Sequence, residues 1–404
     1  MTRPALSSRL EGFGTTIFSE MTRLAIEHGA INLAQGFPDF DGPEFAKEAA
    51  IAAIRAGHGQ YARVTGIPEL HRRLSEKYRR DWGLDYAADA EITVTSGATE
   101  AIFDAINGVC DAGDEVILFE PFYDSYKASV AMAGAKAVYV TLRAPDWKFD
   151  LRELEGAFSS RTRAIMLNTP HNPTGKVFSR DELDAIARLC REHDVVCVTD
   201  EVYEHLVYEG KHVPMASIPG MRERTITISS FGKTFSLTGW KIGWAAAPPN
   251  LTAAVRAAHQ FVTFATATPL QHAAASAFEA PPSYYADLLA SYRRKRDYLS
   301  SELAAIGFDV HPAHGTYFCC AGFSRFHGGD DAAFCRWLTS EIGVAALPPT
   351  SFYGKSDEGK RYARFAFCKK DETLAEAVKR LRRNLTPPAP SPGGEGAARA
   401  GVRG

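Results

Sequence analysis

Hydrophobic residues in the middle of the chain fall into short runs, and longer amphipathic stretches separate several of these runs. The short runs are rich in residues that favour β-structure, and they predict strands at 91–96, 115–120, 136–142, 164–169, 195–200, 225–230 and 243–248. The amphipathic stretches predict helices at 44–57, 67–82, 99–110, 124–133 and 179–193. Strands that are apolar throughout and lie between helices predict a buried, mainly parallel sheet flanked by helices, and hence an α/β fold.

The pattern changes near Tyr284, where a long helix is predicted to begin. The segments after it predict a smaller α+β unit, with a strand at 315–323, a helix at 331–342, a strand at 361–368 and a helix at 371–385. We therefore expect an N-terminal arm that belongs partly to the small domain at 1–43, a large domain at 44–285, and a small C-terminal domain at 286–386. Residues 387–404 are rich in Pro, Gly and Ala and predict a disordered tail.

Composition narrows the class of protein. The 404 residues are 45% hydrophobic and 23% charged, which is typical of a globular chain of two or three domains. A net charge of −2 and the absence of a basic stripe argue against nucleic-acid binding, and no apolar stretch of about 18 residues indicates a membrane span. The start of the sequence does not resemble a signal peptide, and the seven cysteines form no Cys-x-x-Cys pair, so we expect a cytoplasmic protein with reduced thiols and no metal.

Four polar residues, Asn172, Asp200, Tyr203 and Lys233, end or follow predicted strands. Open α/β sheets bind ligands at the carboxyl ends of their strands, so these side chains are expected to share a site. A lysine that can bond to an aldehyde, a carboxylate, a phenol and an amide are the groups that pyridoxal phosphate requires of a protein. Each residue also has a structural interpretation: an exposed lysine, a helix cap or salt bridge, a packed ring, and a turn residue before proline.

The segment from residue 95 to 100 leaves a predicted strand and opens a helix. Backbone N–H groups at such a helix start bind anions, so Gly97, Ala98 and Thr99 are candidates for a phosphate cradle, although an ordinary capped helix start is the alternative. Gly232-Lys233-Thr234 looks like the end of a nucleotide-binding loop, but that motif needs a glycine where this chain has Thr227, which argues against a kinase or ATPase.

Five segments in consistent order give the chain a family resemblance. They are Ile-Asn-Leu-Ala-Gln-Gly-Phe-Pro-Asp-Phe (31–40), Glu-Pro-Phe-Tyr-Asp-Ser-Tyr (120–126), Thr-Pro-His-Asn-Pro-Thr-Gly (169–175), Asp-Glu-Val-Tyr (200–203) and Ser-Phe-Gly-Lys-Thr-Phe-Ser-Leu-Thr-Gly-Trp-Lys-Ile-Gly-Trp (230–244). Together they resemble the class I/II aminotransferases of the aspartate-aminotransferase fold, and most of all the branch of kynurenine aminotransferases and bacterial methionine aminotransferases. The resemblance runs from about residue 10 to residue 385. It implies that the large domain binds pyridoxal 5'-phosphate.

The resemblance also implies a role for each site residue. Lys233 would bind the cofactor covalently and carry protons, Asp200 would pair with the pyridine nitrogen, and Asn172 and Tyr203 would donate to the phenolic oxygen. The phosphate ligands would be Gly97, Ala98, Thr99, Ser230 and Lys241, the last often arginine in the family, together with Tyr61 across a homodimer interface. Tyr123 would stack on the ring. Substrate would contact Phe18, Gly36, Asn172 and Arg364, with Arg364 gripping the α-carboxylate.

The expected activity is transfer of an amine from an amino acid to a 2-oxo acid by ping-pong half-reactions. Phe18, Tyr61, Tyr123, Phe264 and Phe352 match or neighbour pocket positions of the family, which favours an uncharged donor such as methionine, an aromatic amino acid or kynurenine. A pyridoxal-phosphate β-lyase acting on cysteine conjugates or cystathionine is the alternative, because the same fold and lysine serve both reactions.

Overall fold

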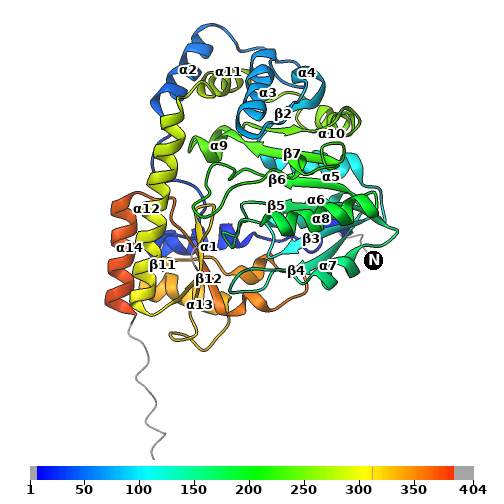
Figure 1. Ribbon diagram of the computed structural model, residues 1–404. Helices are drawn as coiled ribbons and strands as arrows, with labels where there is room; N and C mark the ends of the chain where they lie inside the picture. Colours follow the sequence, from blue (N-terminus) through cyan, green and yellow to red (C-terminus); the bar gives the residue numbers. More distant parts are fainter. Residues whose placement is uncertain (1–6, 312, 386–404) are drawn as a thin grey trace, which may run out of the picture.

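The computed structural model describes residues 7–311 and 313–385. Its centre is a seven-stranded sheet with the order β2-β8-β7-β6-β5-β3-β4 (Figure 1). The strands are β2 (Ile92–Thr95), β3 (Glu115–Glu120), β4 (Lys136–Thr141), β5 (Thr162–Asn168), β6 (Val196–Asp200), β7 (Thr225–Ser230) and β8 (Gly243–Ala246). β8 runs antiparallel to both of its neighbours and every other pairing is parallel. The predicted strands and the mainly parallel sheet are confirmed.

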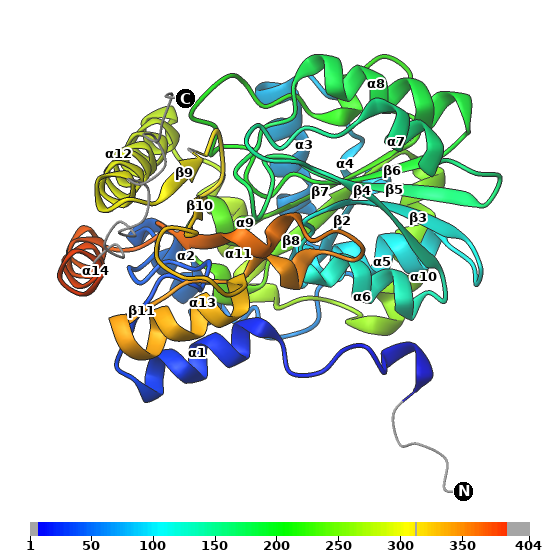
Figure 2. The same cartoon turned by 90° about the horizontal axis from the view of Figure 1, so that it is seen from below.

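Helices cover both faces of this sheet (Figure 2). One face packs on α5 (Ala98–Val109), α6 (Asp124–Met132) and α10 (Pro249–Val262), and the other on α7 (Leu151–Ala157) and α8 (Arg180–Glu192). The alternation of side chains along a strand explains this, since Val116 and Leu118 point into the first core while Ile117 and Phe119 point into the second. Both faces are therefore apolar, as the continuous hydrophobic runs predicted.

A third layer closes the β2 edge of the sheet. There, α2 (Glu44–Arg55), α3 (Pro68–Trp82) and α11 (Thr268–Ala277) pack against β2 and β8, beside the short α4 (Ala88–Glu91). Of the helices of this large part, α7, α10 and α11 were not predicted from the sequence, and neither were the four-residue helices α4 and α9 (Phe231–Thr234). α7 has only seven residues and α11 is rich in alanine, so neither carries a strong amphipathic period, whereas α10 buries Leu251, Val255 and His259 at helical spacing and its pattern was available in the sequence.

A smaller unit is built around an antiparallel sheet of order β12-β10-β9, formed by β9 (Asp309–His311), β10 (Phe318–Gly322) and β12 (Tyr362–Ala366). The surrounding helices are α1 (Ile17–Glu27), α12 (Pro282–Ile306), α13 (Asp331–Trp337) and α14 (Asp371–Asn384). β1 (Ile31–Asn32) pairs with β11 (Val344–Ala345), which joins the arm to the C-terminal third. The exact domain limits stay a prediction, and the predicted tail at 387–404 lies outside the described residues.

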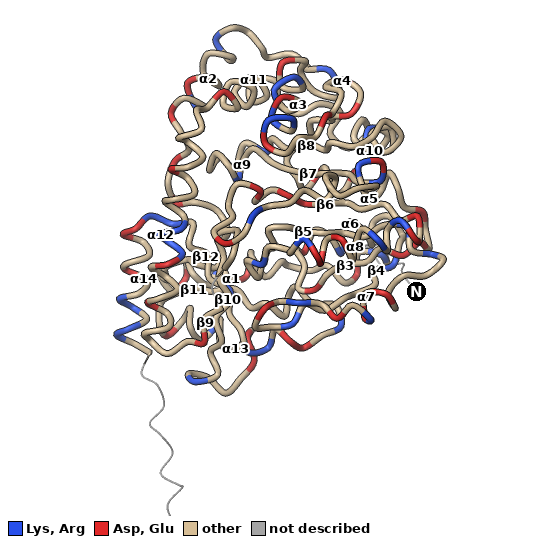
Figure 3. Tube along the Cα trace, in the orientation of Figure 1, with Lys and Arg blue, Asp and Glu red and all other residues tan. Residues whose placement is uncertain are grey.

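The remaining general expectations concern charge, thiols and membranes. Acidic and basic residues are interspersed along the chain trace (Figure 3). All seven cysteines are buried and unbridged. Within residues 7–311 and 313–385, no helix combines the length and the hydropathy that are needed to cross a membrane.

Candidate active site

A cavity of about 250 Å³ lies where the carboxyl ends of β5, β6 and β7 meet the start of α5, the arm and β12. Of the fourteen residues predicted for the site, thirteen line it: Phe18, Gly36, Gly97, Ala98, Thr99, Tyr123, Asn172, Asp200, Tyr203, Ser230, Lys233, Lys241 and Arg364. These residues are up to 346 positions apart in the sequence, from Phe18 to Arg364, so the fold brings together groups that local motifs only suggested.

Lys233 lies in the short helix α9 (Phe231–Thr234), which begins directly after β7. Its Nζ donates a hydrogen bond to the Tyr317 hydroxyl at 2.9 Å and lies 5.8 Å from the centre of the Tyr203 ring. Burial lowers the pKa of Lys233 to about 8. The amine can therefore gain and lose a proton near neutral pH, which is what a general base needs.

Asp200 ends β6 and is 5% exposed. Its Oδ2 accepts a hydrogen bond of 2.6 Å from the Tyr126 hydroxyl. Burial raises the pKa of Asp200 to about 6, and the bond from Tyr126 acts in the opposite direction. No basic side chain of the described residues forms a salt bridge with it, so a cation in the cavity would be its natural partner and would restore its charge.

Helix α5 begins at Ala98, and Gly97 before it has a φ of +82°. A Cβ on Gly243 would lie 2.5 Å from the Gly97 carbonyl carbon, so glycine there lets β8 approach the helix start. Lys241 places its Nζ 3.0 Å from the point that a Cβ of Gly97 would occupy. The helix N–H groups, the helix dipole and this ammonium are together suited to bind an anion, and we call this candidate site the phosphate cradle (residues 97–99 with Ser230 and Lys241).

Arg364 lies on β12 and is 1% exposed. Its Nη1 donates to Asn172 Oδ1 at 2.9 Å, its Nη2 donates to the Ala34 carbonyl at 2.6 Å, and its guanidinium lies 4.0 Å from the centre of the Phe318 ring. Its Nε is buried without a hydrogen-bond partner, and no carboxylate of the described residues forms a salt bridge with it. A buried arginine without an acid is costly, so this side chain is set to receive an anion from the cavity.

Three of the predicted residues lie elsewhere. Tyr61 is 82% exposed and packs edge-to-face on Phe264, at 5.3 Å between ring centres, and neither lines the cavity of its own chain. Phe352 is buried behind the cavity, 5.8 Å from Phe18 between ring centres. Phe264 and Phe352 were expected to match or neighbour pocket positions. Phe352 supports Phe18, which lines the cavity, whereas Phe264 lies beside Tyr61 and is 46% exposed, so its place in a pocket stays a prediction.

The structure also brings in residues that sequence reasoning did not single out. Tyr126 holds Asp200, Tyr317 holds Lys233, and Gln35 lines the cavity wall. Tyr126 stands in one of the recognised segments, three positions after Tyr123, so the helical spacing was the available signal. No such signal marked Tyr317, because a tyrosine within an apolar run is typical of the hydrophobic core.

The cavity fits pyridoxal phosphate by the chemistry of its donors. It offers an anion cradle, a buried carboxylate that lacks a cation, and a lysine whose pKa is lowered, all around one space. These are the groups that would hold the phosphate, the ring nitrogen and the aldehyde of this cofactor. An α/β fold with this site at its strand ends defines a pyridoxal-phosphate enzyme.

The sequence profile described as aminotransferase class I and II matches residues 28–381. The chain belongs to this family, whose members are pyridoxal-phosphate-dependent transaminases. The predicted family, enzyme class and cofactor are confirmed.

Three relatives illustrate the similarity. The probable N-succinyldiaminopimelate aminotransferase DapC of Mycobacterium tuberculosis is 46% identical over 93% of this chain and 97% of its own. The methionine aminotransferase of Escherichia coli is 42% identical over 93% and 97%, and human kynurenine–oxoglutarate transaminase 3 is 40% identical over 92% and 88%. The solved structure of the M. tuberculosis N-succinyldiaminopimelate aminotransferase superposes with a TM-score of 0.91 and 47% identity, covering 94% of this chain and all of that one.

Proposed function

We propose that the protein moves the amine of an uncharged amino acid, such as methionine, an aromatic amino acid or kynurenine, to a 2-oxo acid. The observation that carries this proposal is Arg364, a buried guanidinium without an acidic partner that faces the same cavity as Lys233. A fork of N–H donors at this point suits the α-carboxylate that amino acids and 2-oxo acids share. Gly36, whose backbone lines the cavity beside it, would complete the carboxylate site.

In the proposed roles, the phosphate cradle holds the cofactor, Tyr123 packs on its ring, and Asn172 and Tyr203 hold its phenolic oxygen. Asp200 supplies a negative charge to the cavity wall. When bound, pyridoxal phosphate supplies an aldehyde that takes up the amine and a ring that withdraws electrons from Cα. Lys233 moves the proton at its Nζ, since burial lowers the pKa of this amine to about 8.

The charges around the cavity support an uncharged donor. Three cationic side chains of the described residues line it, and Lys233, Lys241 and Arg364 each have a proposed task. Gln35 has its side-chain nitrogen committed to the Phe18 carbonyl and the Thr22 hydroxyl, at 3.2 and 2.6 Å. A donor with a carboxylate on its side chain would bury that charge without a partner.

We further propose a homodimer with shared active sites. Tyr61, Phe261, Val262 and Phe264 are apolar or aromatic side chains that are 82%, 86%, 52% and 46% exposed. Such a patch is typical of an interface. It supports the proposal that Tyr61 of each chain completes the phosphate cradle of the other.

A panel of amino donors tests the activity. Methionine, phenylalanine and kynurenine are each compared with aspartate and with N-succinyldiaminopimelate, the acidic substrate named for one relative, and pyruvate and ammonia are measured as the products of β-elimination. We expect kcat/KM to favour the uncharged donors by at least about tenfold, a difference of about 1.4 kcal/mol. Equal or greater efficiency with either acid would overturn the uncharged-donor proposal, and pyruvate with ammonia as main products would favour the β-lyase.

A further inference from the structure

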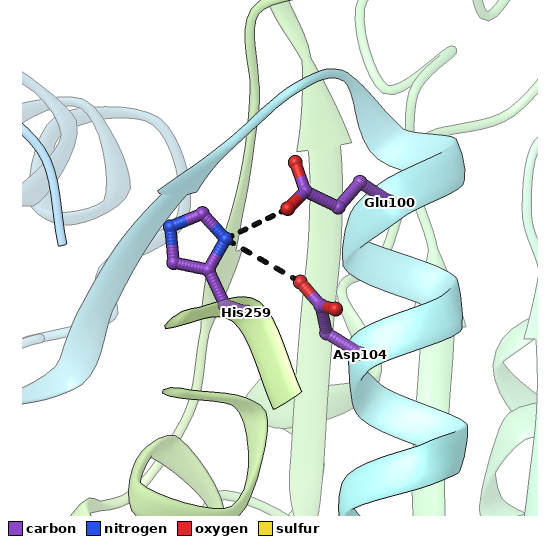
Figure 4. A group of neighbouring side chains, drawn as sticks. All are labelled: Glu100, Asp104 and His259. Carbon is purple, nitrogen blue, oxygen red and sulfur yellow. Dashed lines mark hydrogen bonds and ion pairs between the residues drawn. The ribbon is translucent and has the colours of Figure 1, made fainter. Parts of the chain in front are cut away.

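Behind the phosphate cradle, two carboxylates and a histidine form a buried cluster (Figure 4). Glu100 and Asp104 lie one turn apart on α5, and His259 reaches them from α10. The His259 Nδ1 is 2.8 Å from Glu100 Oε1 and 3.6 Å from Asp104 Oδ2. None of these residues lines the cavity, and the proposed reaction gives them no task.

The hydrogen bonds of His259 define its protonation. Its Nε2 lies 2.7 Å from the Val64 carbonyl, which can only accept, and its Nδ1 faces carboxylates. Glu100, at 2.8 Å from Nδ1, is the acid that faces this nitrogen. Against the effect of burial, which would raise the pKa of Glu100, its hydrogen bonds with His259 and with the Ser96 N–H lower that pKa, so Glu100 is ionised and accepts. Both ring nitrogens therefore donate, and the ring is an imidazolium. Burial alone would lower the pKa of His259, but the interactions with Asp104 and Glu100 outweigh it and raise this pKa to about 10.

Glu100 connects this cation to the cradle. It is the third residue of α5, and its second oxygen accepts a hydrogen bond from the Ser96 backbone N–H, at the turn that leads into Gly97. A lone negative charge so close behind the cradle would repel a phosphate. The imidazolium offsets that repulsion, while the hydrogen bond from the Ser96 N–H to Glu100 still stabilises the turn before Gly97.

We propose that His259 is a positioning residue for the phosphate cradle: its positive charge neutralises Glu100, and its bond to Val64 ties the segment after Tyr61 to the same point. The inference rests on the proposed function, in which residues 97–99 bind the cofactor phosphate. A bound metal ion is the competing interpretation. A metal would take the lone pair of Nδ1, whereas here Nδ1 and Glu100 are within direct hydrogen-bond distance.

The test compares the affinities of the full-length chain for pyridoxal 5'-phosphate and for pyridoxal, which lacks the phosphate. The association constant for pyridoxal 5'-phosphate divided by the association constant for pyridoxal isolates the contribution of the phosphate, and this quotient is the ratio used below. His259→Gln should lower this ratio about tenfold, because Glu100 regains its full negative effect. The double variant His259→Gln/Glu100→Gln should return it to within about threefold of wild type, since the negative charge nearest the cradle is then gone together with the imidazolium, while Asp104 lies one turn further along α5 and is present in every variant. A merely structural role for His259 predicts no such rescue.

Further variants distinguish a failure of the proposed phosphate cradle from a failure of the proposed role of His259. Glu100→Gln alone should raise the ratio, and this result stands even where His259→Gln does not fold. His28→Gln, at an exposed histidine after α1, is the matched control and should change nothing. If Lys241→Met does not lower the ratio, the proposal that the cradle binds the cofactor phosphate is overturned, and with it the role of His259. If Lys241→Met lowers the ratio but His259→Gln leaves it unchanged, the role of His259 alone is overturned. A metal ion that the wild-type protein binds stoichiometrically and that the His259→Gln variant has lost would also overturn that role alone.

Discussion

The hydroxyl of Tyr317 stands between Lys233 and the arm: it accepts a hydrogen bond of 2.9 Å from Lys233 Nζ and donates one of 2.7 Å to the Gly36 carbonyl. Because its single proton is committed to Gly36, Tyr317 can only accept from the lysine. One N–H of the amine is thus fixed, which leaves its lone pair free to turn toward the cavity. The same hydroxyl links the proton carrier to the residue proposed to bind the substrate carboxylate.

Replacing Tyr317 by phenylalanine should lower kcat about tenfold, because the hydrogen bond that orients the amine is lost while the ring still packs. The KM for the amino donor should change less than kcat. Steady-state kinetics measures both. Tyr292→Phe is the matched control, since its ring lies 5.8 Å from that of Tyr317 and its buried hydroxyl has no partner among the described residues. Equal losses in the two variants would show that packing, and not the bond to Lys233, matters.

Arg364→Lys should lower kcat/KM for the amino donor about 100-fold, mainly through KM. A lysine keeps the charge but loses the fork that grips a carboxylate with two parallel bonds, and charged hydrogen bonds contribute about 1.5–3 kcal/mol. Arg361→Lys, at an exposed position just before β12, should leave the kinetics unchanged. If Arg364→Lys behaves like Arg361→Lys, the carboxylate site lies elsewhere.

Lys233→Met should stabilise the cofactor-free protein at pH 7 by about 3 kcal/mol. Burial depresses the pKa of Lys233 from an ordinary 10.5 to about 8 in the folded state, so the unfolded chain binds the extra proton between these values. The buried ammonium therefore lowers the free energy of unfolding by its full amount below pH 8, and this penalty disappears as the pH rises to 10.5. Denaturant unfolding across this range should show the gain shrinking with pH, while Lys211→Met, at an exposed lysine, shows none.

Mixing inactive variants tests the shared site. Tyr61→Ala and Lys233→Ala each leave little activity, but their mixed dimers contain one intact site, so an equal mixture should recover about a quarter of the wild-type rate. Lys233→Ala mixed with Arg364→Ala should recover nothing, because these two residues line the cavity of the same chain. Recovery in the second mixture but not in the first would contradict the proposed sharing, and so would full turnover by a monomer.

The sequence predicted most of the sheet because its strands are continuous apolar runs, a local property. It also predicted thirteen cavity residues, because eight of them stand in the five recognised segments and three at the helix start of residues 95–100, while Phe18 and Arg364 came from the family resemblance alone. The exposure of Phe264 and the packing of Phe352 against Phe18 could not be predicted from the sequence, because the exposure of a ring depends on packing that no local pattern encodes.

Tyr317 and His259 went unnoticed for the same reason. Tyr317 meets Lys233 across 84 positions, and His259 meets Glu100 across 159, so their roles arise only when the chain folds. Buried polar groups of this kind are recognised by their partners, and partners at long range are invisible in one sequence.

Covalent labelling gives the most direct test of the proposed chemistry. The full-length protein, loaded with pyridoxal phosphate, is reduced with borohydride, digested and mapped by mass spectrometry. Lys233 should carry the reduced cofactor in nearly every molecule, because its pKa is lowered and it lies within the cavity. Label on Lys241, the other lysine of the cavity lining, or on no lysine at all, would contradict the assignment of Lys233.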